Sequence, residues 1–485
     1  MSETLQSVDL AVIAVYIVGV VVFGSYFMGR SKTLEGFTVG SRSLPGWAVG
    51  LSILGTYVSS ISFLANPGKS YLGNWTPFVF GLGLPIACWI ASRYFIPLYR
   101  DKLQTTAYEH LEGRFGYWAR AYSGISLILL QIGRIGVVLY LISLAMSEFV
   151  PLTVPQLILV LGILTILYTV LGGIEAVIWT DVVQTIVLLG GGVACCVLLL
   201  MKVPEGGLQQ AWDAGKFDFG GWDFNLAKEA FWVVFIFGIV DNLRNFSVDQ
   251  NYVQRFLAAE SEREARKSVW LGGLSYLPVS ALFFLIGTLL YLFYQAQPPA
   301  ALPTEADKVF PFFIVNTLPV GVRGLVIAAL LAAGMSTLDS SINASATVFT
   351  VDFYKRFFKA DDARLLWITR GTTVVVGVIG MGTSLFMIKE KSVLDAWWKI
   401  SGVFGGGMLG IFFLGLMVPR ASRRHAIVAV IAGVVVIAWG TFCRGEDAAV
   451  RFPFHPFMIG PCGTLTIVLV GWLASKLFDD PRADA

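Results

Sequence analysis

The sequence has few charged residues for its length. Asp, Glu, Lys and Arg make up 14% of its 485 residues, whereas soluble proteins carry about 25%. Hydrophobic residues account for 56%, and the mean hydropathy is +0.72. This composition excludes an ordinary soluble protein and indicates a polytopic membrane protein. The 35 basic and 32 acidic residues nearly balance, so the net charge gives no reason to expect a nucleic-acid partner.

Cysteine is also scarce. The five cysteines are too few for a disulfide scaffold in a chain of this length. Cys88, Cys195 and Cys196 lie in apolar runs, where a free cysteine behaves as a small hydrophobic residue. Cys443 and Cys462 flank one polar loop, which leaves a disulfide between them open.

Long loops and catalytic motifs are missing. The longest connection, 203–228, is too short to fold as a separate domain, and we find no P-loop, HExxH, GxSxG or CxxC pair. The three histidines lie near loops rather than on one helix face. These absences argue against an ATP-driven pump and against an enzyme, so any transport is expected to run on an ion or solute gradient.

The hydrophobic residues gather in runs that can cross a membrane. The hydrocarbon core of a bilayer is about 30 Å thick and needs roughly 20 apolar residues per helix. Thirteen segments qualify: 8–28, 46–71, 76–99, 121–149, 155–172, 175–202, 229–251, 268–295, 322–350, 366–388, 393–418, 425–442 and 455–475. We therefore predict an all-α membrane protein with about 13 transmembrane helices. Pro67 and Gly68 interrupt the second segment, and the seventh carries Asp241, Arg244 and Asp249.

The basic residues are distributed unevenly over the connections. With the N-terminus outside, the inner segments hold 22 Lys and Arg residues and the outer segments hold nine. Because basic residues favour the cytoplasmic side, we expect the N-terminus outside and residues 476–485 as a cytoplasmic tail. We expect residues 1–475 to form one membrane domain, in a bacterial inner membrane, in contact with lipid.

Arg134 is the clearest charged residue at membrane depth. It lies in the middle of the segment 121–149, with apolar neighbours and flanking glycines. Charged side chains in this environment are costly and usually face a partner or a cavity. Two interpretations stay open: a structural Arg that bridges helices, and a bidentate ligand for an anionic or hydroxyl-rich substrate.

Hydroxyl groups cluster in two spans. Thr56, Ser59, Ser60 and Ser62 lie in the segment 46–71, where an unwound stretch would free backbone carbonyls for a cation. The alternative is that these hydroxyls bond back to the preceding turn and that the proline only kinks the helix.

The span 322–350 carries the second cluster. Ser336, Thr337 and Ser340 share one helix surface, with Asp339 beside them. Oxygen ligands with few formal charges suit an alkali ion, although small residues also mark close helix contacts. Asp181, early in the span 175–202, is either a cation ligand or a carboxylate that stabilises the helix N-terminus.

At these residues the sequence resembles the sodium:solute symporter family, which includes sodium-coupled sugar, proline, pantothenate, iodide and sialic acid transporters. The resemblance covers about residues 8–475, and the most specific stretches are 44–68, 172–181, 254–259 and 333–355. It implies a leucine-transporter-like fold with two inverted repeats of five helices, about 46–202 and 229–442, whose first helices are broken. The first helix would then be peripheral, and the last, about 455–475, would lie outside the repeats.

The resemblance also implies one or two Na⁺ sites. The first would use backbone carbonyls of Gly55, Val58 and Ala333 with the hydroxyls of Ser336 and Thr337.

A second site would use Asp181, Ser336, Asp339 and Ser340. The family pattern has a serine where Asp339 stands. This departure leaves a stronger, a proton-coupled or a rearranged site open, because two carboxylates in one pocket repel unless a cation or proton intervenes.

For the substrate, the residues around Arg134 resemble those of sialic acid transporters. The candidate substrate contacts are Tyr57, Ser59, Ser60, Ser62, Phe63 and Arg134. The glutamine expected on the following helix is absent from 77–83, and Tyr57 replaces a smaller residue. We therefore expect sodium-coupled import of a small solute by alternating access, with a sugar acid or other carboxylate favoured. A neutral sugar or polyol is the alternative, followed by a passive channel or a solute sensor. The oligomeric state stays open, with a monomer as the expected functional unit.

Overall fold

The protein is described from a computed structural model that covers residues 5–27, 32–101, 105–299, 302–389, 393–443 and 450–478. Within these ranges the secondary structure is helical, apart from one isolated bridge between Leu44 and Ala259. The first ten helices are α1 Ser7–Tyr26, α2 Leu34–Val39, α3 Gly46–Tyr57, α4 Asn66–Leu72, α5 Leu84–Ile90, α6 Ile96–Asp101, α7 Glu109–Phe115, α8 Tyr117–Met146, α9 Val154–Leu200 and α10 Gly207–Asp213. The others are α11 Phe231–Val248, α12 Gln250–Ala258, α13 Glu262–Ala296, α14 Ala306–Thr317, α15 Val322–Val348, α16 Lys355–Phe357, α17 Asp362–Phe386, α18 Val393–Met417, α19 Arg423–Phe442 and α20 Ile459–Leu477.

The predicted all-α membrane fold is confirmed. Among the described residues, 11 helices are long and apolar enough to cross a membrane, or up to 12 if the bent pair 46–57 and 61–72 is one span. Helix α9 has 47 residues and would extend about 70 Å if straight, more than twice the thickness of a bilayer core. Gly173 interrupts it with φ 62° and ψ −169°, between the predicted spans 155–172 and 175–202. The total of thirteen spans stays a prediction.

The second span is broken at a different place from the one the sequence suggested. Helix α3 ends at Tyr57, and Val58 leaves the helical region with φ −82° and ψ 88°. A π-helical turn, Ile61–Ala65, then leads into α4, and the two halves meet at 58°. Pro67 lies in the first turn of α4, where a missing N–H costs no hydrogen bond. The interruption predicted at Pro67 and Gly68 is therefore wrong in position, and the actual break lies about ten residues earlier.

The first helix of the second predicted repeat is also broken. Helix α11 ends at Val248, Asp249 adopts an extended backbone, and α12 begins at Gln250. The Asp249 carboxylate accepts a hydrogen bond from the Asn251 N–H at 3.0 Å, so its side chain caps the new helix. Charged and polar residues thus stabilise this break.

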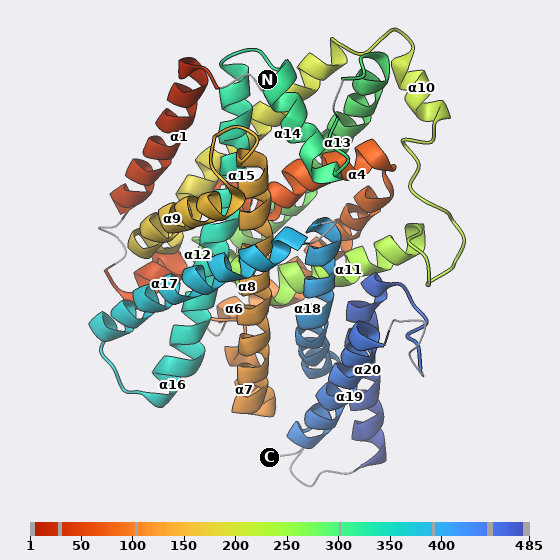
Figure 1. The fold of residues 1–485 in the computed structure, drawn as a ribbon. Helices are drawn as coiled ribbons and strands as arrows, with labels where there is room; N and C mark the ends of the chain where they lie inside the picture. The colour runs from red at the N-terminus through yellow and green to blue at the C-terminus, as the bar shows by residue number, and fades with distance from the viewer. Residues whose placement is uncertain are drawn as a thin grey trace.

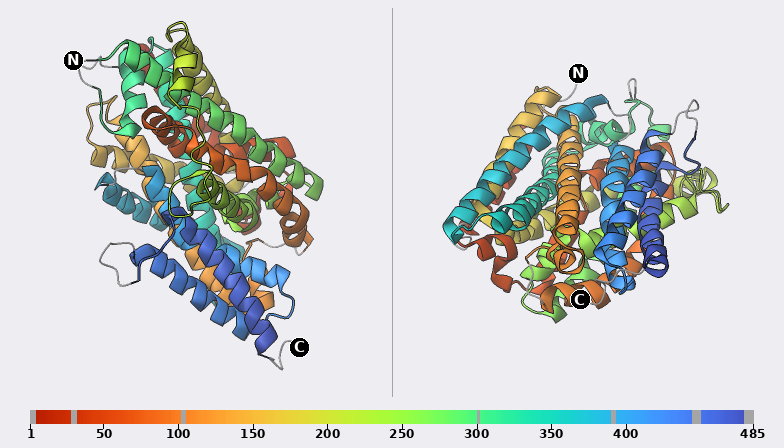
Figure 2. Two further views of the ribbon diagram at one scale, coloured as in Figure 1. Left: turned by 90° about the vertical axis from the view of Figure 1, so that its right-hand side faces the viewer. Right: turned by 90° about the horizontal axis from the view of Figure 1, so that it is seen from below.

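The most buried of the membrane-spanning helices, α15, packs against α8, α9 and α1 at the centre of the molecule. Helix α1 lies at the periphery and is joined to α15 by a buried ion pair between Asp9 and Arg323 at 3.1 Å. Helices α19 and α20 pack against each other on the other side (Figures 1 and 2). The N-terminal and C-terminal ends of the chain lie at opposite ends of the molecule in Figure 1, which fits an odd number of crossings. Which end faces the cytoplasm stays a prediction.

All five cysteines lie in the described residues, and all are free thiols. The disulfide considered between Cys443 and Cys462 is therefore not formed. Residues 479–485 of the predicted tail lie outside the described residues.

Candidate functional site

A small cavity lies beside the break in the second span. Its free volume is about 50 Å³, room for a few water molecules. Sixteen residues from six parts of the chain line it: Tyr57, Ser59, Ile61, Ser62, Asn66, Pro77, Phe80, Arg134, Asp241, Asn245, Tyr252, Tyr276, Phe284, Leu394, Trp397 and Trp398. The wall thus combines hydroxyl, amide and charged groups with large aromatic rings, a composition typical of a small-molecule site.

Arg134 reaches this cavity from α8. It is buried, with 6% of its surface exposed, and its Nη2 donates a hydrogen bond to the Thr56 carbonyl at 2.7 Å. The guanidinium also lies over the Trp397 ring, 5.6 Å from the ring centroid. Arg134 forms no ion pair with any described residue, so its charge is balanced by no carboxylate in direct contact. A cation placed in this way favours an anionic ligand.

The predicted substrate contacts of the second span separate into two groups. Tyr57, Ser59 and Ser62 line the cavity together with Arg134. Ser60 instead donates a hydrogen bond to the Val138 carbonyl at 3.3 Å, and it is not among the lining residues. Its role as a substrate contact stays a prediction.

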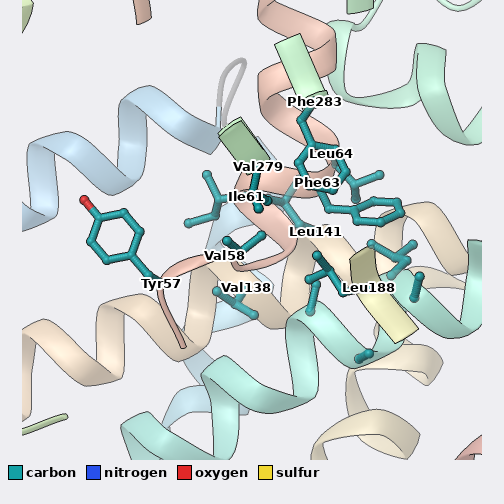
Figure 3. Close-up of a cluster of buried hydrophobic side chains, with 14 of the residues drawn as sticks. Tyr57, Val58, Ile61, Phe63, Leu64, Val138, Leu141, Leu188, Val279 and Phe283 are labelled. Atoms are coloured by element: carbon teal, nitrogen blue, oxygen red, sulfur yellow. The ribbon is translucent and has the colours of Figure 1, made fainter. Parts of the chain in front are cut away.

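Phe63 is the other predicted contact that does not line the cavity. It is fully buried, and its ring lies 4.9 Å from that of Phe283 and 5.5 Å from that of Phe310. Figure 3 shows Tyr57 directed away from the cluster that contains Phe63, Leu64 and Phe283. Tyr57 therefore faces the cavity and Phe63 the hydrophobic core.

The sequence analysis assigned no function to the cavity wall formed by α11 and α18. Asp241 and Asn245, one helical turn apart, line the cavity from α11. The Asp241 carboxylate accepts hydrogen bonds from Arg244 Nε at 3.0 Å and from the Ser401 hydroxyl. The charges of Asp241 and Arg244 were visible in the sequence, but their partner Ser401 comes from α18, more than 150 residues away. No local pattern could have revealed this contact.

The residues predicted for the first sodium site meet between α3 and α15. A Cβ atom placed on Gly55 would lie 3.4 Å from Ser336 Oγ and 2.4 Å from Thr185 Oγ1, so the backbone of α3 approaches these hydroxyls closely. Thr337 Oγ1 donates a hydrogen bond to the Ala333 carbonyl at 3.1 Å. Thr185 is an additional oxygen that the sequence analysis missed.

Val58, the remaining predicted ligand, begins the break after α3. It lies one turn beyond Gly55, at the point where backbone carbonyls leave the helical hydrogen-bond pattern. Oxygen atoms of backbone and hydroxyl groups suit Na⁺. Among the described residues no group of three or more His, Cys, Asp or Glu side chains could hold a metal ion.

The structure also brings together the residues predicted for the second sodium site. Ser336 Oγ donates to Asp181 at 2.5 Å, and Ser340 Oγ donates to Asp339 at 3.2 Å. All four side chains are buried, and Tyr168 donates a further hydrogen bond to Asp339 at 3.1 Å. The helical spacing on α15 predicted this cluster, while packing against α9 supplied Asp181.

Arg255, which the sequence analysis left without a role, enters the same cluster from α12. Its Nη2 lies 2.7 Å from Asp181 and 2.7 Å from Ser340 Oγ, and its Nε donates to Ser52 at 2.7 Å. The cluster thus holds two carboxylates and one guanidinium. With both carboxylates ionised it carries a net charge of −1, which one further cation would balance.

An ion pair lies near the cavity, between the second half of the broken span and α18. Lys69 of α4 lies 3.0 Å from Asp395 in the first turn of α18. Trp397 and Trp398, which line the cavity, follow in the same turn. The ion pair therefore joins the second half of the broken span to the helix that covers the cavity. A second cavity of about 1,030 Å³, lined in part by Lys69, lies beyond it.

A helical membrane fold with broken spans, a buried polar cavity and adjacent oxygen-rich clusters defines an ion-coupled secondary transporter. The model of the sodium:solute symporter family matches residues 37–433, so the chain belongs to the sodium:solute symporter family. It is 32% identical to the sodium/sialic acid symporter SiaT of Proteus mirabilis, over 97% of this chain and 95% of that protein. It is 28% identical to human sodium-coupled monocarboxylate transporter 1, over 89% of this chain and 72% of that protein.

Solved structures agree with this assignment. A sodium-coupled sialic acid symporter in its substrate-bound outward-open state has a TM-score of 0.89 and 30% sequence identity, with 98% of both chains covered. The nucleobase-cation symporter Mhp1, closed around bromovinylhydantoin, has a TM-score of 0.60 at 15% identity and shares the fold alone. The chain is therefore a sodium-coupled symporter of a small solute, and its relatives are transporters rather than enzymes.

Proposed function

We propose that this symporter imports an anionic sugar acid, similar to sialic acid, together with Na⁺. The observation that carries the proposal is Arg134, a buried cation that lines the cavity without an ion-pair partner among the described residues. A substrate carboxylate would supply the missing charge, and bidentate hydrogen bonds to it are the preferred geometry of a guanidinium. The names of the relatives, sialic acid and monocarboxylate transporters, favour the same chemical class.

The rest of the wall favours a hydroxyl-rich anion over a small monocarboxylate. Ser59, Ser62, Asn66, Asp241 and Asn245 offer hydroxyl, amide and carboxylate oxygens that can accept hydrogen bonds from the hydroxyl groups of a sugar. The same oxygens support the second candidate, a neutral sugar or polyol, in which case Arg134 would serve only to hold the Thr56 carbonyl.

The cavity must enlarge before such a solute can bind. Small-molecule pockets have volumes of about 300–1,000 Å³, whereas this cavity has about 50 Å³. Movement of Trp397 and Trp398 away from α4 would connect it with the larger outer cavity. The contracted pocket is consistent with a closed state in an alternating-access cycle.

Sodium binding would stabilise the broken span. We propose that carbonyls of Gly55, Val58 and Ala333 and the hydroxyls of Ser336 and Thr337 hold one ion. Asp181, Ser336, Asp339 and Ser340 would hold a second. The first site contains both the end of α3 and the start of the break, so an ion there would order the backbone next to Tyr57 and Ser59, which face the substrate.

Each entering ion supplies enough energy for accumulation. It contributes roughly 2.3 kcal/mol per 100 mV and about 1.4 kcal/mol per tenfold concentration difference. When the two contributions are added, the entry of one ion can drive the accumulation of a neutral solute by several hundredfold. For a monoanion one ion gives electroneutral transport, and two ions restore the contribution of the membrane potential.

Because both proposed sites lie within one chain, a monomer would suffice as the functional unit. The bacterial sialic acid symporters among the relatives support a location in a bacterial inner membrane. The charge distribution of the sequence supports an outer N-terminus and a cytoplasmic tail.

The proposed substrate class can be tested by thermal unfolding of the purified protein. The protein would be heated with and without Na⁺ in the presence of sugar acids, short monocarboxylates, neutral sugars and amino acids. We expect a sugar acid to raise the melting temperature only with Na⁺, and Arg134→Ala to abolish this effect. Arg420→Ala is the matched control, because Arg420 is exposed and does not line the cavity. Sodium-dependent stabilisation by a neutral sugar that persists in Arg134→Ala would favour the second candidate.

A further inference from the structure

A hollow of about 700 Å³ lies where α13 begins and shares no lining residue with the solute cavity. It is lined by Ser92, Glu262, Arg263, Arg266, Lys267 and Trp270. Ser92 belongs to a π-helical turn, Ala91–Phe95, between α5 and α6. The first two turns of α13 supply the other residues. Two adjacent spans therefore enclose a polar hollow at one end of the membrane domain.

The hollow has an excess of positive charge. Arg266 pairs with Glu262 at 2.5 Å, and Lys267 pairs with Glu264 on the same helix. Arg263 is exposed and forms no ion pair among the described residues. The Arg266 Nε group is buried without a hydrogen-bond acceptor. One unpaired cation and one unused donor therefore face a site that still has room for an anion.

A fourth basic residue and two aromatic rings lie close to Ser92 in the sequence. Arg93, next to Ser92, lies over the ring of Tyr94 at 5.6 Å from its centroid. Tyr94 and Trp89 are about half exposed. Trp and Tyr rings concentrate at the level of lipid headgroups, so this end of α5 and α13 lies at the membrane interface.

Apolar side chains continue from the hollow along the outer faces of the same helices. Leu271 and Leu274 of α13 are 40% and 38% exposed, and Ile86 of α5 is 40% exposed. A ligand with a negatively charged head and hydrocarbon chains would match this surface, because its head would meet the basic residues and its chains the apolar stripe. A soluble anion would leave the apolar surface unused.

The hollow belongs to the more basic end of the chain. Arg100 Nη1, at the end of α6, donates hydrogen bonds to the carbonyls of Phe256 and Ala259 at 2.8 Å each, so the loop before α13 lies beside the connection that follows α6. Both connections are on the side where the sequence places 22 basic residues. Basic clusters on the cytoplasmic side attract the anionic lipids of the inner leaflet.

We propose that this hollow binds an anionic phospholipid of the cytoplasmic leaflet, with its phosphate between Arg263 and Arg266 and its acyl chains along α5 and α13. The site is independent of the proposed substrate. Binding there stabilises α13 in its contact with α3, the first half of the broken span.

The contact between α13 and α3 is tight enough to transmit such an effect. A Cβ atom on Gly46 would lie 2.4 Å from Glu264 Oε2, and one on Gly50 would lie 2.7 Å from Leu271 Cδ2. Lys267, on the wall of the hollow, pairs with the same Glu264. A bound headgroup therefore acts on Glu264, which contacts α3 directly at Gly46, about two and a half turns before Gly55.

The experiment measures lipid binding to the complete protein in detergent micelles by native mass spectrometry and thermal unfolding. Phosphatidylglycerol is titrated in parallel with phosphatidylcholine of the same acyl chains and with inorganic phosphate. We expect phosphatidylglycerol to bind and to raise the melting temperature at concentrations at which the other two have no effect. Equal effects of inorganic phosphate would overturn the lipid assignment in favour of a soluble anion, and equal effects of phosphatidylcholine would show that headgroup charge plays no part.

The test variant is the triple substitution Arg263→Gln, Arg266→Gln and Lys267→Gln. We expect it to weaken phosphatidylglycerol binding roughly one hundredfold, since each basic residue near an anionic lipid contributes about a factor of five.

The matched control is Lys355→Gln, Lys359→Gln and Arg364→Gln. It removes the same charge from exposed positions around α16, on the same predicted side of the membrane, and leaves the hollow intact. If the triple variant does not fold, the single variant Arg263→Gln is used instead. We expect it to weaken phosphatidylglycerol binding about fivefold. Unchanged binding in the folded variants, or an equal loss in the control, would contradict the proposal.

Discussion

Arg255 and Asp181 form a buried ion pair of 2.7 Å between α12 and α9, at the position predicted for a second sodium ion. Arg255 also donates a hydrogen bond to Ser340 at 2.7 Å, so a protein cation already contacts two of the four predicted sodium ligands. Asp339, which has no arginine in direct contact, remains the carboxylate whose charge a bound ion would balance.

Replacement of Arg255 by Gln is expected to destabilise the protein by about 3–5 kcal/mol in sodium-free buffer, because it leaves the buried Asp181 carboxylate without its cation. Na⁺ should then stabilise the variant more than it stabilises the wild type, since the ion can take the place of the guanidinium. Thermal unfolding over a range of Na⁺ concentrations measures both effects. Arg255→Lys keeps the charge and should show a smaller loss of stability and a smaller extra stabilisation by Na⁺. An unchanged sodium dependence in Arg255→Gln would exclude an ion at this cluster.

Replacement of Asp339 by Ala removes the carboxylate that carries the unbalanced charge of the cluster, together with its oxygen ligands. The cluster then contains one carboxylate and one guanidinium and has no net charge to balance. We expect the ratio of transported sodium to solute to fall by one and the maximum accumulation to fall several hundredfold, because one ion contributes roughly 2.3 kcal/mol per 100 mV in addition to its concentration gradient.

Parallel uptake of radioactive sodium and labelled solute into proteoliposomes measures this ratio. Asp339→Asn, which also removes the charge but keeps the size of the side chain, should have the same effect as Asp339→Ala. A ratio that stays the same in both variants would show that Asp339 does not hold a coupled ion.

The ion pair between Lys69 and Asp395 should affect closure of the outer side. Both side chains are about one-quarter to one-third exposed, and pairs of this kind contribute up to about 1 kcal/mol. Lys69→Asp and Asp395→Lys should each raise the KM for solute about two- to fivefold, and the double exchange should restore it. Lys308→Asp is a suitable control, because Lys308 pairs with Glu305 within one helical turn and joins no two spans. If the KM of the double variant is no lower than the KM values of the single variants, the ion pair has no role in closure.

Acid should weaken the contact of α7 with α8 and α16 through Glu112. Burial by itself would raise the pKa of Glu112, but hydrogen bonds from Arg120 at 2.8 Å and Arg356 at 2.9 Å outweigh it, and the pKa lies below its usual value. The stabilising effect of this carboxylate is therefore complete above its unfolded pKa of about 4.3 and is lost as the pH falls through the lower, folded value.

We expect Glu112→Gln to lower the melting temperature at neutral pH and to reduce its dependence on pH below about pH 5. Melting curves between neutral and acidic pH test this expectation. Glu148→Gln, at a residue for which no ion pair occurs among the described residues, is the comparison. If the wild type and Glu112→Gln lose stability in parallel on acidification, the two arginines do not stabilise the ionised form of Glu112.

Two groups of site residues were predictable from the sequence because each lies on one helix. Ser336, Asp339 and Ser340 follow helical spacing on α15, and the structure places them in one cluster. Arg134 was recognisable because a charge within an apolar span needs a compensating environment, and the structure places it on the cavity wall. In both cases the relevant information is local in the chain.

The position of the break in the second span was not predictable in the same way. Pro67 and Gly68 are the residues that local propensity marks as interruptions, yet Pro67 is tolerated in the first turn of α4. The chain leaves the helix at Val58, where Ser59 Oγ accepts a hydrogen bond from the Ile61 N–H at 3.1 Å and Arg134 binds the preceding Thr56 carbonyl. A partner from another helix therefore stabilises the break.

By itself, the sequence determined the membrane-spanning helices, the family and the oxygen-rich face of α15, since hydrophobic runs and helical spacing are properties of short stretches. Only the tertiary structure decided that Arg255 meets Asp181, that α11 and α18 complete the cavity, and that Phe63 belongs to the core. These contacts join residues far apart in the chain, and their energies depend on burial and on the geometry of packed helices. Such geometry is fixed only when all the spans come together.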